Sequence, residues 1–429
     1  MIKIRQYFNT LEITKGFFIA LLNTAFIYLS YWGLVHPLIF STLGLLGLYL
    51  LLASNTKTWF ISGAFTGLFW FWWISLSLKH YEMLWAIPVV LLILMLSYGL
   101  LFAFIAWTSH RLPTILRLQT TLLPLLLKSL GLLTLSYVHP FGFDWFKPEL
   151  VFVQSYFGIQ KVQFALILLA ISLAIWRKQL PYLLLTLLAL EPMTSQTEKI
   201  SKNIALITTH TTVQDKWNKH KHQAQFDAIL KTIDDAIAKK KTLVILPESV
   251  FPIFLNHSEL LMYKLKRRSK RIAIVVGALY WDGQTPRNST YIFTKDNIQI
   301  ANKVLLVPFG EANPLPDFLS DWVNEVFYDN AVDYKASSTV SDYTIDGVTY
   351  RNAICFEATS EKLYEKGKNG KRPSQMIVLS NNGWFTPSIE PTLQRLLLQY
   401  YSRKYGTNIY HAVNMSPSYV IQDGNVFYR

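Results

Sequence analysis

Long apolar stretches recur through the first 190 residues of this chain and restrict its possible folds more than any other feature. A helix that crosses a bilayer needs about 20 predominantly apolar residues. Stretches of roughly this kind follow one another near residues 17–34, 37–53, 58–78, 86–108, 120–138, 162–176 and 179–191. The last two are short, so we expect them to tilt little, pair as a hairpin or thin the bilayer locally. The sequence predicts a multispan α-helical membrane domain of about seven helices over residues 1–192.

The composition changes after Glu191. Of all residues 51% are hydrophobic, and 13 are Trp, which is typical of chains with aromatic belts at membrane interfaces. The first apolar stretch is not a cleavable signal peptide, because a second follows almost at once without a small-residue cleavage pattern. Charge concentrates in the C-terminal half. We therefore predict a membrane protein with an attached soluble domain.

The net charge of +14 is a weaker indication of function. The run Lys264–Arg271 suits a solvated helix face that contacts anionic lipid headgroups. No recognised nucleic-acid motif accompanies the charge, so we expect no nucleic-acid partner.

Basic residues predict the orientation in the membrane. With a cytoplasmic N-terminus, the inner side carries Lys3, Arg5, Lys15, Lys57, Arg111, Arg117, Arg177 and Lys178. The opposite loops are poorer in Lys and Arg, in agreement with the positive-inside rule. An odd number of spans then places everything after Glu191 in a bacterial periplasm. We expect a multi-pass protein of the bacterial inner (cytoplasmic) membrane.

Two features of the membrane half are unusual. The loop His139–Pro148 is aromatic and broken by Pro and Gly, so we expect it to lie in the interface, as an aromatic belt or as a route for lipid. Lys128 falls inside the fifth stretch, where a charge is costly. A functional role, snorkelling and packing against a polar neighbour all remain open for this lysine.

Residues 193–202 are polar and form a predicted linker to a domain at 203–429. In that domain short β-rich runs alternate with helical patterns, which indicates α/β layers. Candidate strands are 204–208, 242–246, 272–279, 289–294, 301–307, 351–355 and 375–380, and candidate helices are 216–240, 258–269, 361–367 and 391–405.

Cys355 is the single cysteine of the chain, so it has no internal disulfide partner. Small and apolar residues precede it in Tyr350-Arg-Asn-Ala-Ile-Cys355, which indicates a buried strand that delivers a thiol to a sharp turn. A carboxylate, Glu357, follows two positions later. Glu248 ends the apolar run Leu243-Val-Ile-Leu-Pro-Glu248, where partial burial would raise its pKa toward that of a useful base.

Lys303 begins a third run, Lys303-Val-Leu-Leu-Val-Pro-Phe-Gly-Glu311. Base, cation and nucleophile would then each stand at a strand end, and together they suit thiol-based acyl chemistry. Each residue also has a structural explanation: a Glu after a strand often caps a turn, a lone Lys is usually solvated, and a buried Cys is often a small core residue.

These runs resemble the Glu–Lys–Cys signature of the nitrilase (carbon–nitrogen hydrolase) superfamily over roughly residues 203–425. The motifs are Leu-Pro-Glu248, Lys303 before Pro308-Phe-Gly-Glu311, Cys355-Phe-Glu357 and Ser380-Asn-Asn-Gly-Trp-Phe385. With a multispan N-terminal half, the whole chain resembles the membrane-bound branch, the bacterial apolipoprotein N-acyltransferases. The resemblance implies a nitrilase-like αββα sandwich in the soluble half.

The resemblance also implies a two-step acyl transfer. Cys355 is the nucleophile, Glu248 the general base and Lys303 the group that stabilises the oxyanion. The acyl chain passes from a phospholipid, typically phosphatidylethanolamine, through a Cys355 thioester to the amine of a diacylglyceryl-cysteine lipoprotein. Glu311, Glu357 and Trp384 are supporting candidates, as an orienting or second basic group, an organiser of the turn and a wall of the acyl pocket.

The implied enzyme needs no metal or other cofactor, and one Glu–Lys–Cys set per chain suits a monomer. Residues 313–328 carry large apolar side chains, which suits either a lid that dips into lipid or an amphipathic helix on the domain core. The family commonly closes with a further membrane helix. Here the chain ends at Asp423–Arg429 without one, so we expect the C-terminus to remain outside.

Three other functions compete with acyl transfer. A membrane-tethered amidase or nitrile hydrolase would use the same three residues, with water resolving the thioester. The many spans favour lipid substrates over this hydrolase. A structural role in envelope assembly would leave an intact Glu–Lys–Cys set unused, and a transporter would leave the soluble domain without a task.

Overall fold

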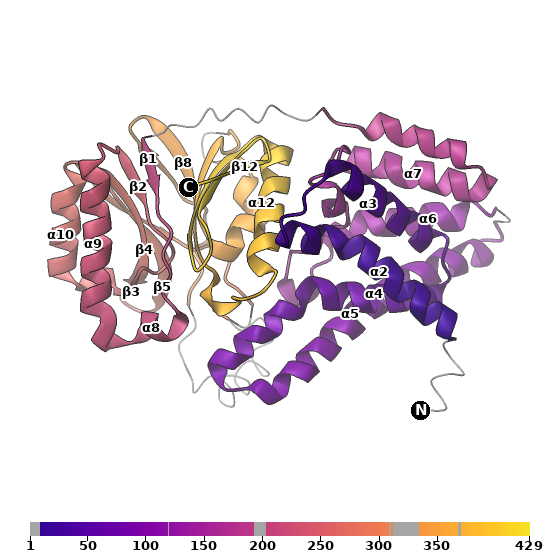
Figure 1. The fold of residues 1–429 in the computed structure, drawn as a ribbon, viewed down its shortest axis with the longest axis horizontal. Helices are drawn as coiled ribbons and strands as arrows, with labels where there is room; N and C mark the ends of the chain where they lie inside the picture. The colour runs from indigo at the N-terminus through magenta and orange to yellow at the C-terminus, as the bar shows by residue number, and fades with distance from the viewer. Residues whose placement is uncertain (1–8, 119, 193–202, 309, 312–333, 368–369) are drawn as a thin grey trace. The chain divides into compact units, whose positions relative to one another are not determined.

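A computed structural model describes residues 9–118, 120–192, 203–308, 310–311, 334–367 and 370–429 (Figure 1). The chain divides into two compact units. The helical unit comprises Met1–Pro140, Asp144–Met193 and Pro387–Leu396, and the sheet unit comprises Phe141–Phe143, Thr194–Thr386 and Leu397–Arg429.

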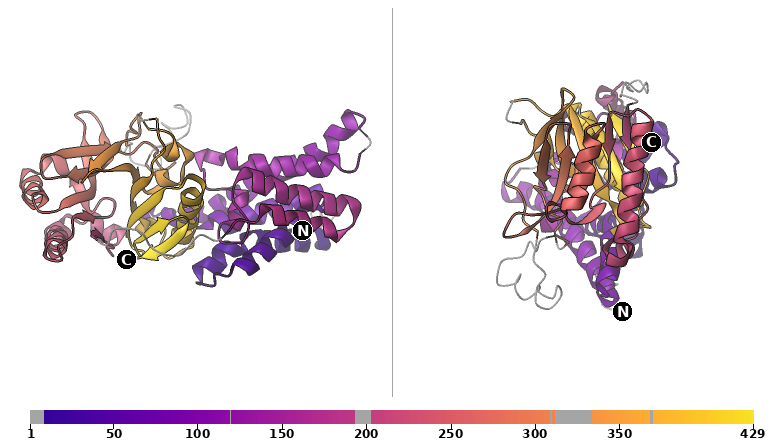
Figure 2. Two further views of the ribbon diagram at one scale, coloured as in Figure 1. Left: turned by 90° about the horizontal axis from the view of Figure 1, so that it is seen from above. Right: turned by 90° about the vertical axis from the view of Figure 1, so that its left-hand side faces the viewer.

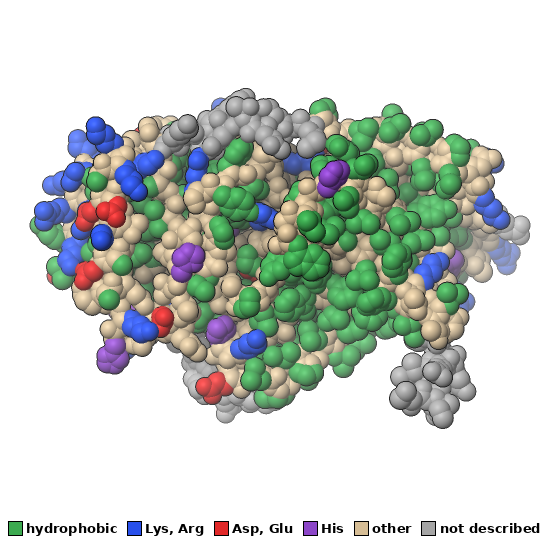
Figure 3. All heavy atoms as spheres, in the orientation of Figure 1, with side chains coloured by type: hydrophobic (Ala, Val, Ile, Leu, Met, Phe, Trp, Pro, Cys, Tyr) green, Lys and Arg blue, Asp and Glu red, His purple; other side chains and the backbone are tan. Residues whose placement is uncertain are grey.

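Helices make up the secondary structure of the first 190 residues, as the apolar pattern predicts. They are α2 (Thr10–Tyr31), α3 (Pro37–Leu52), α4 (Thr56–Phe71), α5 (Ile87–Ile115), α6 (Leu123–Thr134) and α7 (Lys161–Arg177), with 3₁₀ segments η1 (Trp72–Tyr81), η2 (Leu84–Ala86), η3 (Leu135–Tyr137), η4 (Pro140–Gly142), η5 (Pro148–Phe152) and η6 (Leu180–Ala189). Within the described residues, three continuous helical segments are long and apolar enough to cross a membrane: Thr10–Tyr31, Thr56–Tyr81 and Leu84–Ile115. The helical unit shows a largely hydrophobic surface on the face in Figure 3.

Small residues bring α4 and α5 together. A side chain at Gly63 would lie 2.5 Å from the Tyr98 carbonyl oxygen, and one at Gly67 would lie 2.8 Å from the Leu94 carbonyl oxygen. Small residues spaced four apart let the backbones of membrane helices approach each other closely. In lipid such helices are held together by van der Waals packing, because the hydrophobic effect does not drive them together there.

Lys128 does not snorkel away from the protein. Its side chain on α6 is buried, and its ammonium donates to the carbonyls of Leu52 at 3.2 Å and Ser54 at 2.7 Å. These carbonyls lie at the C-terminal end of α3, where backbone acceptors have no partner within the helix and the dipole favours a cation. Lys128 therefore packs against a polar neighbour and caps α3.

The aromatic loop after η3 is held by buried ion pairs. Lys147 pairs with Asp144, and Lys161 lies 2.8 Å from the fully buried carboxylate of Glu149. Trp145 and Phe146 are buried as well. These two aromatic side chains therefore pack inside the helical unit.

In its described residues, the sheet unit forms two sheets of six strands each. The first has the order β1-β2-β4-β5-β6, with β3 also paired to β4, and the second has the order β12-β11-β10-β9-β8-β7. The strands are β1 (Ile204–Leu206), β2 (Leu243–Ile245), β3 (Phe251–Phe254), β4 (Ala273–Trp281), β5 (Pro286–Phe293), β6 (Ile298–Asn302), β7 (Asp342–Ile345), β8 (Val348–Ile354), β9 (Gln375–Asn381), β10 (Asn408–Asn414), β11 (Tyr419–Gln422) and β12 (Asn425–Tyr428). The pairs β1–β2, β2–β4, β8–β9 and β9–β10 are parallel.

Helices cover the outer faces of the two sheets (Figures 1 and 2). They are α9 (His222–Ala238), α10 (Glu259–Ser269) and α12 (Glu390–Tyr405). The described chain after residue 203 also contains the short helix α8 (Val213–Trp217) and the 3₁₀ turns η7 (Lys219–Lys221), η8 (Leu255–His257), η9 (Cys355–Thr359), η10 (Glu361–Tyr364) and η11 (Asn382–Trp384). The C-terminal half of α12 lies beside the second sheet, where the Gln399 amide donates to the Gly424 carbonyl at 2.7 Å. The order helix, sheet, sheet, helix is the predicted αββα sandwich.

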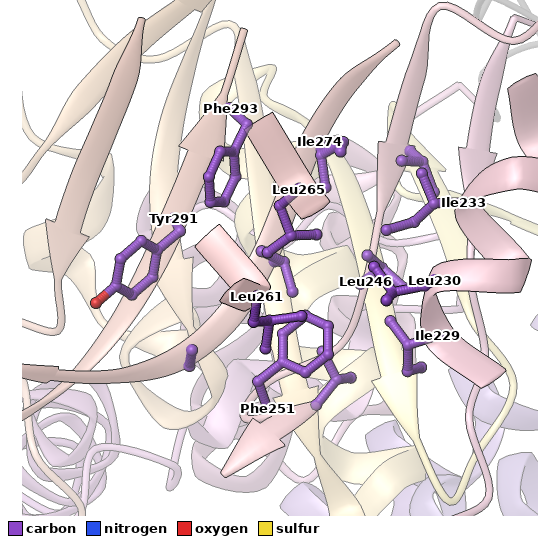
Figure 4. Close-up of a cluster of buried hydrophobic side chains, with 14 of the residues drawn as sticks. Ile229, Leu230, Ile233, Leu246, Phe251, Leu261, Leu265, Ile274, Tyr291 and Phe293 are labelled. Atoms are coloured by element: carbon purple, nitrogen blue, oxygen red, sulfur yellow. The ribbon is translucent and has the colours of Figure 1, made fainter. Parts of the chain in front are cut away.

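Two apolar cores hold these layers together. Side chains of the first sheet, such as Ile245 and Val275, pack between the sheets against Ile377, Leu379 and others of the second. A second core lies between the first sheet and helices α9 and α10, with the side chains labelled in Figure 4. Because both faces of the first sheet are covered, β2 and β4 are continuous apolar runs, which is why the sequence identifies them readily.

Strands β3, β7, β10, β11 and β12 are absent from the predicted elements, and three predicted elements differ from the observed ones. The strand expected at 301–307 ends at Asn302, because the N–H groups of Val304 and Leu305 donate to a side chain described below. The helix expected at 216–240 is interrupted at Asn218, whose side chain accepts from the His220 N–H. The helix expected at 361–367 is a single 3₁₀ turn, η10.

Candidate active site

The three residues singled out by the sequence each follow a strand. Glu248 comes after β2, Lys303 directly after β6, and Cys355 directly after β8. The structure brings their charges together, because Glu248 and Cys355 both act electrostatically on the Lys303 ammonium. All three belong to the sheet unit. A strand end suits such residues, since the strand holds the backbone in place and the side chain projects beyond the last paired residues.

A tight backbone approach places Glu248. A side chain at Gly277 on β4 would come within 2.5 Å of the Ser249 nitrogen and 2.7 Å of the Glu248 Cα. Only glycine allows the turn to pass this close to β4. Ser249 itself adopts a φ of 47°, in the left-handed region. The Glu248 carboxylate is thereby held inward, with 8% of the residue exposed.

Lys303 lies in a buried network with two carboxylates. Its ammonium is 2.7 Å from Glu311 Oε2 and 3.8 Å from Glu248 Oε1, and only 1% of the residue is exposed. The side-chain amide of Asn288 donates to Glu248 Oε1 at 2.8 Å and to Glu311 Oε1 at 2.9 Å. One amide and one ammonium therefore join both carboxylates into a single cluster.

The backbone builds this cluster from adjacent strands. β5 and β6 pair with Ser289 opposite Asn302, and the Lys303 N–H donates to the Asn288 carbonyl at 2.9 Å, which continues the ladder by one residue beyond β6. Asn288 and Lys303 thus stand side by side at the end of the pair. The Glu311 carboxylate, which contacts both residues, also accepts the Val307 N–H at 2.9 Å. The motif from Lys303 to Glu311 therefore closes into a loop around its own ion pair.

Burial and charge shift the ionisation of this cluster. Burial alone would lower the pKa of the Lys303 ammonium, but Glu311, Glu248 and Cys355 outweigh it and raise that pKa above the usual lysine range. Burial raises the pKa of Glu248, against the opposing effects of Lys303, Asn288 and Lys216. The site thus pairs a permanently charged cation with a carboxylate that readily takes up a proton.

Cys355 occupies a sharp turn between β8 and η9. Its φ of 54° lies in the left-handed region, which is uncommon for a residue with a side chain and is often found at functional turns. The residue is partly exposed. The next residue, Phe356, lies with its ring 5.0 Å from the ring of Phe143, which also belongs to the sheet unit.

Glu357 ties the turn at Cys355 to the chain that follows Lys303. Its Oε1 accepts the Ile354 N–H at 2.7 Å, and its Oε2 accepts the N–H groups of Val304 at 2.7 Å and Leu305 at 3.1 Å. The last two are the N–H groups that end β6 early. A single buried carboxylate thus joins the ends of a strand from each sheet.

Glu357 should also make stability depend on pH. Burial raises its pKa from 4.5 to about 7, against Lys303 and the three N–H donors. Between these values the unfolded state has lost a proton that the folded state keeps. The free energy of unfolding therefore falls as pH rises through this window, by about 3 kcal/mol at 1.36 kcal/mol per unit.

We expect Glu357→Gln to lose this pH dependence and to lower the thermal midpoint at pH 5. The Gln amide would point its own N–H groups at a backbone donor, which costs about 1–3 kcal/mol. Intrinsic tryptophan fluorescence on heating, at pH 5 and pH 7, measures both effects. A variant with the wild-type change between the two pH values would contradict this role for Glu357.

The sequence analysis does not identify two residues of the cluster. Asn288 lies within β5, and Lys216 lies on α8 with its ammonium 3.1 Å from the Glu248 carbonyl oxygen. Neither belongs to a run with a recognisable catalytic pattern.

Trp384 is partly exposed at the end of η11, after β9. The expected lid at 313–328 lies outside the described residues.

The chain is similar to known proteins along most of its length. Residues 10–194 match the family model described as the apolipoprotein N-acyltransferase integral membrane domain. The chain is 40% identical over 425 residues to apolipoprotein N-acyltransferase of Wolinella succinogenes, covering 96% of this chain and 97% of the relative. It is 35% identical to that of Helicobacter pylori, covering 91% of this chain and 89% of the relative.

Among solved structures, a CN-hydrolase superfamily protein from Xanthomonas campestris covers 53% of this chain and 85% of its own, with a TM-score of 0.41 and 16% identity. The sequence relatives extend over both the helical and the sheet unit. The chain belongs to the apolipoprotein N-acyltransferase family.

Proposed function

We propose that this protein transfers an acyl chain from a phospholipid to the N-terminal amine of diacylglyceryl-cysteine lipoproteins. The observation that supports this most is the buried cluster of Glu248 and Lys303 beside the Cys355 turn, in a chain related over nearly its whole length to apolipoprotein N-acyltransferases. Phosphatidylethanolamine is the proposed acyl donor. Acyl transfer through a thiol requires a base, a nucleophile and a stabilised oxyanion, and the cluster has a candidate for each.

In the first step, Glu248 takes the Cys355 proton and the thiolate attacks the sn-1 ester carbonyl. Lys303 stabilises the negative oxygen of the tetrahedral intermediate. The ester C–O bond breaks, and the departing alkoxide takes the proton from Glu248 and leaves as a lysophospholipid. Cys355 now carries the acyl chain as a thioester, and the next acceptor meets an activated carbonyl.

In the second step, the lipoprotein amine attacks the thioester carbonyl. Glu248 accepts a proton from the nitrogen, the C–S bond breaks, and the proton returns to the Cys355 sulfur. The products are an amide on the lipoprotein and the free enzyme. Because the two substrates react in turn through one covalent intermediate, ping-pong kinetics follow.

The supporting residues have positional roles in this proposal. Glu311 orients Lys303 through their 2.7 Å ion pair, and Glu357 holds the turn at Cys355 through its contact with the Ile354 N–H. Trp384 is proposed as a wall of the acyl pocket. None of these side chains needs to form or break a covalent bond.

The same proposal covers the arrangement in the cell. Residues 1–192 form the multi-pass domain in the bacterial inner membrane, 193–202 the linker, and 203–429 the catalytic domain on the periplasmic side. The protein works as a monomer. The positive-inside distribution of Lys and Arg supports this orientation.

The test is the intact mass of the detergent-purified protein after incubation with phosphatidylethanolamine. We expect an added fatty-acyl mass that neutral hydroxylamine removes and that Cys355→Ala lacks. Adding a diacylglyceryl-cysteine peptide should then discharge the enzyme and acylate the peptide. Discharge to free fatty acid without acylated peptide would favour the hydrolase instead, and no adduct with any phospholipid would contradict the proposal.

A further inference from the structure

Lys216 is a buried lysine that the reaction steps above do not use. It lies on the short helix α8, whose start is capped by the Thr212 side chain accepting the Asp215 N–H at 3.1 Å. Only 3% of the residue is exposed. Its ammonium donates to the backbone carbonyl of Glu248 at 3.1 Å. A buried ammonium is costly to keep, so its surroundings indicate what it does there.

The surroundings of Lys216 are the reacting groups themselves. Both Glu248 and Cys355 interact electrostatically with its ammonium. Among the described residues, no carboxylate lies within ion-pair distance of it. Burial lowers the pKa of Lys216 to about 8, although Glu248 and Cys355 oppose this effect. At neutral pH the side chain is therefore still mostly a cation, held next to the cluster without being neutralised by a direct partner.

The charge balance of the cluster shows why a second cation matters. Glu248 and Glu311 carry two negative charges against the one positive charge of Lys303, so these three groups leave no positive charge for a thiolate. When Glu248 takes the Cys355 proton, Glu311 and Lys303 cancel each other. The thiolate would then form in an uncharged cluster, and the nearby Glu357 adds negative charge once it ionises.

We propose that Lys216 is a positioning residue that holds the Glu248 turn and supplies the positive charge that favours the Cys355 thiolate. This rests on the proposed function, in which that thiolate is the nucleophile. The Gly277 contact places the Glu248 turn from the β4 side, and the Lys216 hydrogen bond holds it from α8. Among the described residues, the ionisable groups of this cluster are Lys216 and Lys303, which interact electrostatically with Cys355, together with Glu248, Glu311 and Glu357.

The test is the rate at which iodoacetamide alkylates the full-length protein in detergent, followed by intact mass from pH 5 to pH 10. Because the chain has one cysteine, the reaction reports on Cys355 alone. The variants are Lys216→Met, which removes charge and donor, and Lys216→Gln, which removes charge but keeps a donor for the Glu248 carbonyl. Lys219→Met is the matched control, since this exposed lysine lies three residues away in η7.

We expect both Lys216 variants to alkylate about tenfold more slowly at pH 7, with the pH of half-maximal rate raised by about one unit. Lys219→Met should match the wild type. A wild-type alkylation profile in Lys216→Gln would overturn the charge role. A lower thermal midpoint with an unchanged profile in both variants would show a purely structural lysine and would also overturn it.

This assay needs neither lipid nor lipoprotein, so it separates the inference from the proposed function. A shifted profile together with an enzyme that never forms an acyl adduct would leave the Lys216 inference standing and contradict the acyltransferase. An acyl adduct on the wild type, together with Lys216 variants whose alkylation profiles match the wild type, would support the acyltransferase and contradict the Lys216 inference.

Discussion

Replacing Glu248 by Gln is expected to slow formation of the acyl-enzyme by about 10²- to 10⁴-fold at pH 7, the usual contribution of a positioned base. Gln has nearly the same shape, and its carbonyl oxygen still accepts the Asn288 amide that lies 2.8 Å from Glu248 Oε1. Lys303 keeps its ion pair with Glu311. The variant therefore loses the proton acceptor while the cluster around it stays in place.

The rate of fatty-acyl mass gain on the protein measures this effect. Raising the pH should restore part of the rate in Glu248→Gln, because hydroxide can ionise the thiol in place of the missing base. A distorted site would not recover in this way. Glu259→Gln, at the exposed start of α10, is the control for a lost surface carboxylate. An acylation rate in Glu248→Gln equal to the wild type would exclude Glu248 as the base.

Replacing Lys303 by Met should abolish the acyl adduct and also lower the free energy of unfolding by about 3–5 kcal/mol. Removing the ammonium leaves Glu248 and Glu311 as two buried carboxylates joined by the Asn288 amide. Neither can return to water, because the ion pair is almost fully inside the protein. An uncompensated buried charge costs more than the pair itself contributes.

The loss should depend on pH in a defined direction. At low pH one carboxylate of the Lys303→Met variant takes up a proton, which removes the repulsion, so the difference from wild type should shrink as pH falls. Thermal midpoints at pH 5 and pH 8 measure this. The double variant Lys303→Met with Glu311→Gln removes the surplus charge as well. We expect it to recover stability but not acylation.

These results would separate a catalytic cation from a structural one. A double variant that regains acylation would show that Lys303 only neutralises Glu311. A single variant with wild-type stability at pH 8 would show that water or another group reaches the carboxylates. Either outcome would contradict the charge balance on which both this prediction and the role of Lys216 depend.

Much of the fold can be predicted because its signals are local. Apolar runs mark the helices of the first 190 residues, and the continuous apolar strands β2 and β4 stand out because both faces of the first sheet are buried. The predicted end of β6 is wrong by several residues. That end depends on Glu357, which lies 52 residues or more along the chain and accepts the N–H groups of Val304 and Leu305.

The residues of the candidate site likewise fall into two groups, those that the sequence identifies and those that only the structure identifies. Cys355, Glu248 and Lys303 can be singled out by sequence, since each is a reactive residue type that follows a strand. Asn288 and Lys216 cannot, because an amide within a strand and a lysine on a short helix have no distinctive pattern by themselves. Their importance arises only from what they contact, Glu248 in both cases.

The sequence by itself determined the division into a membrane-embedded half and an α/β half, and the candidates for nucleophile, base and cation. Hydrophobic periodicity and residue chemistry are properties of neighbouring residues, so they are visible without a structure. The tertiary structure alone decided how the charges combine. Burial, the left-handed turn at Cys355 and the contacts that gather two carboxylates and two lysines all depend on residues far apart in the chain.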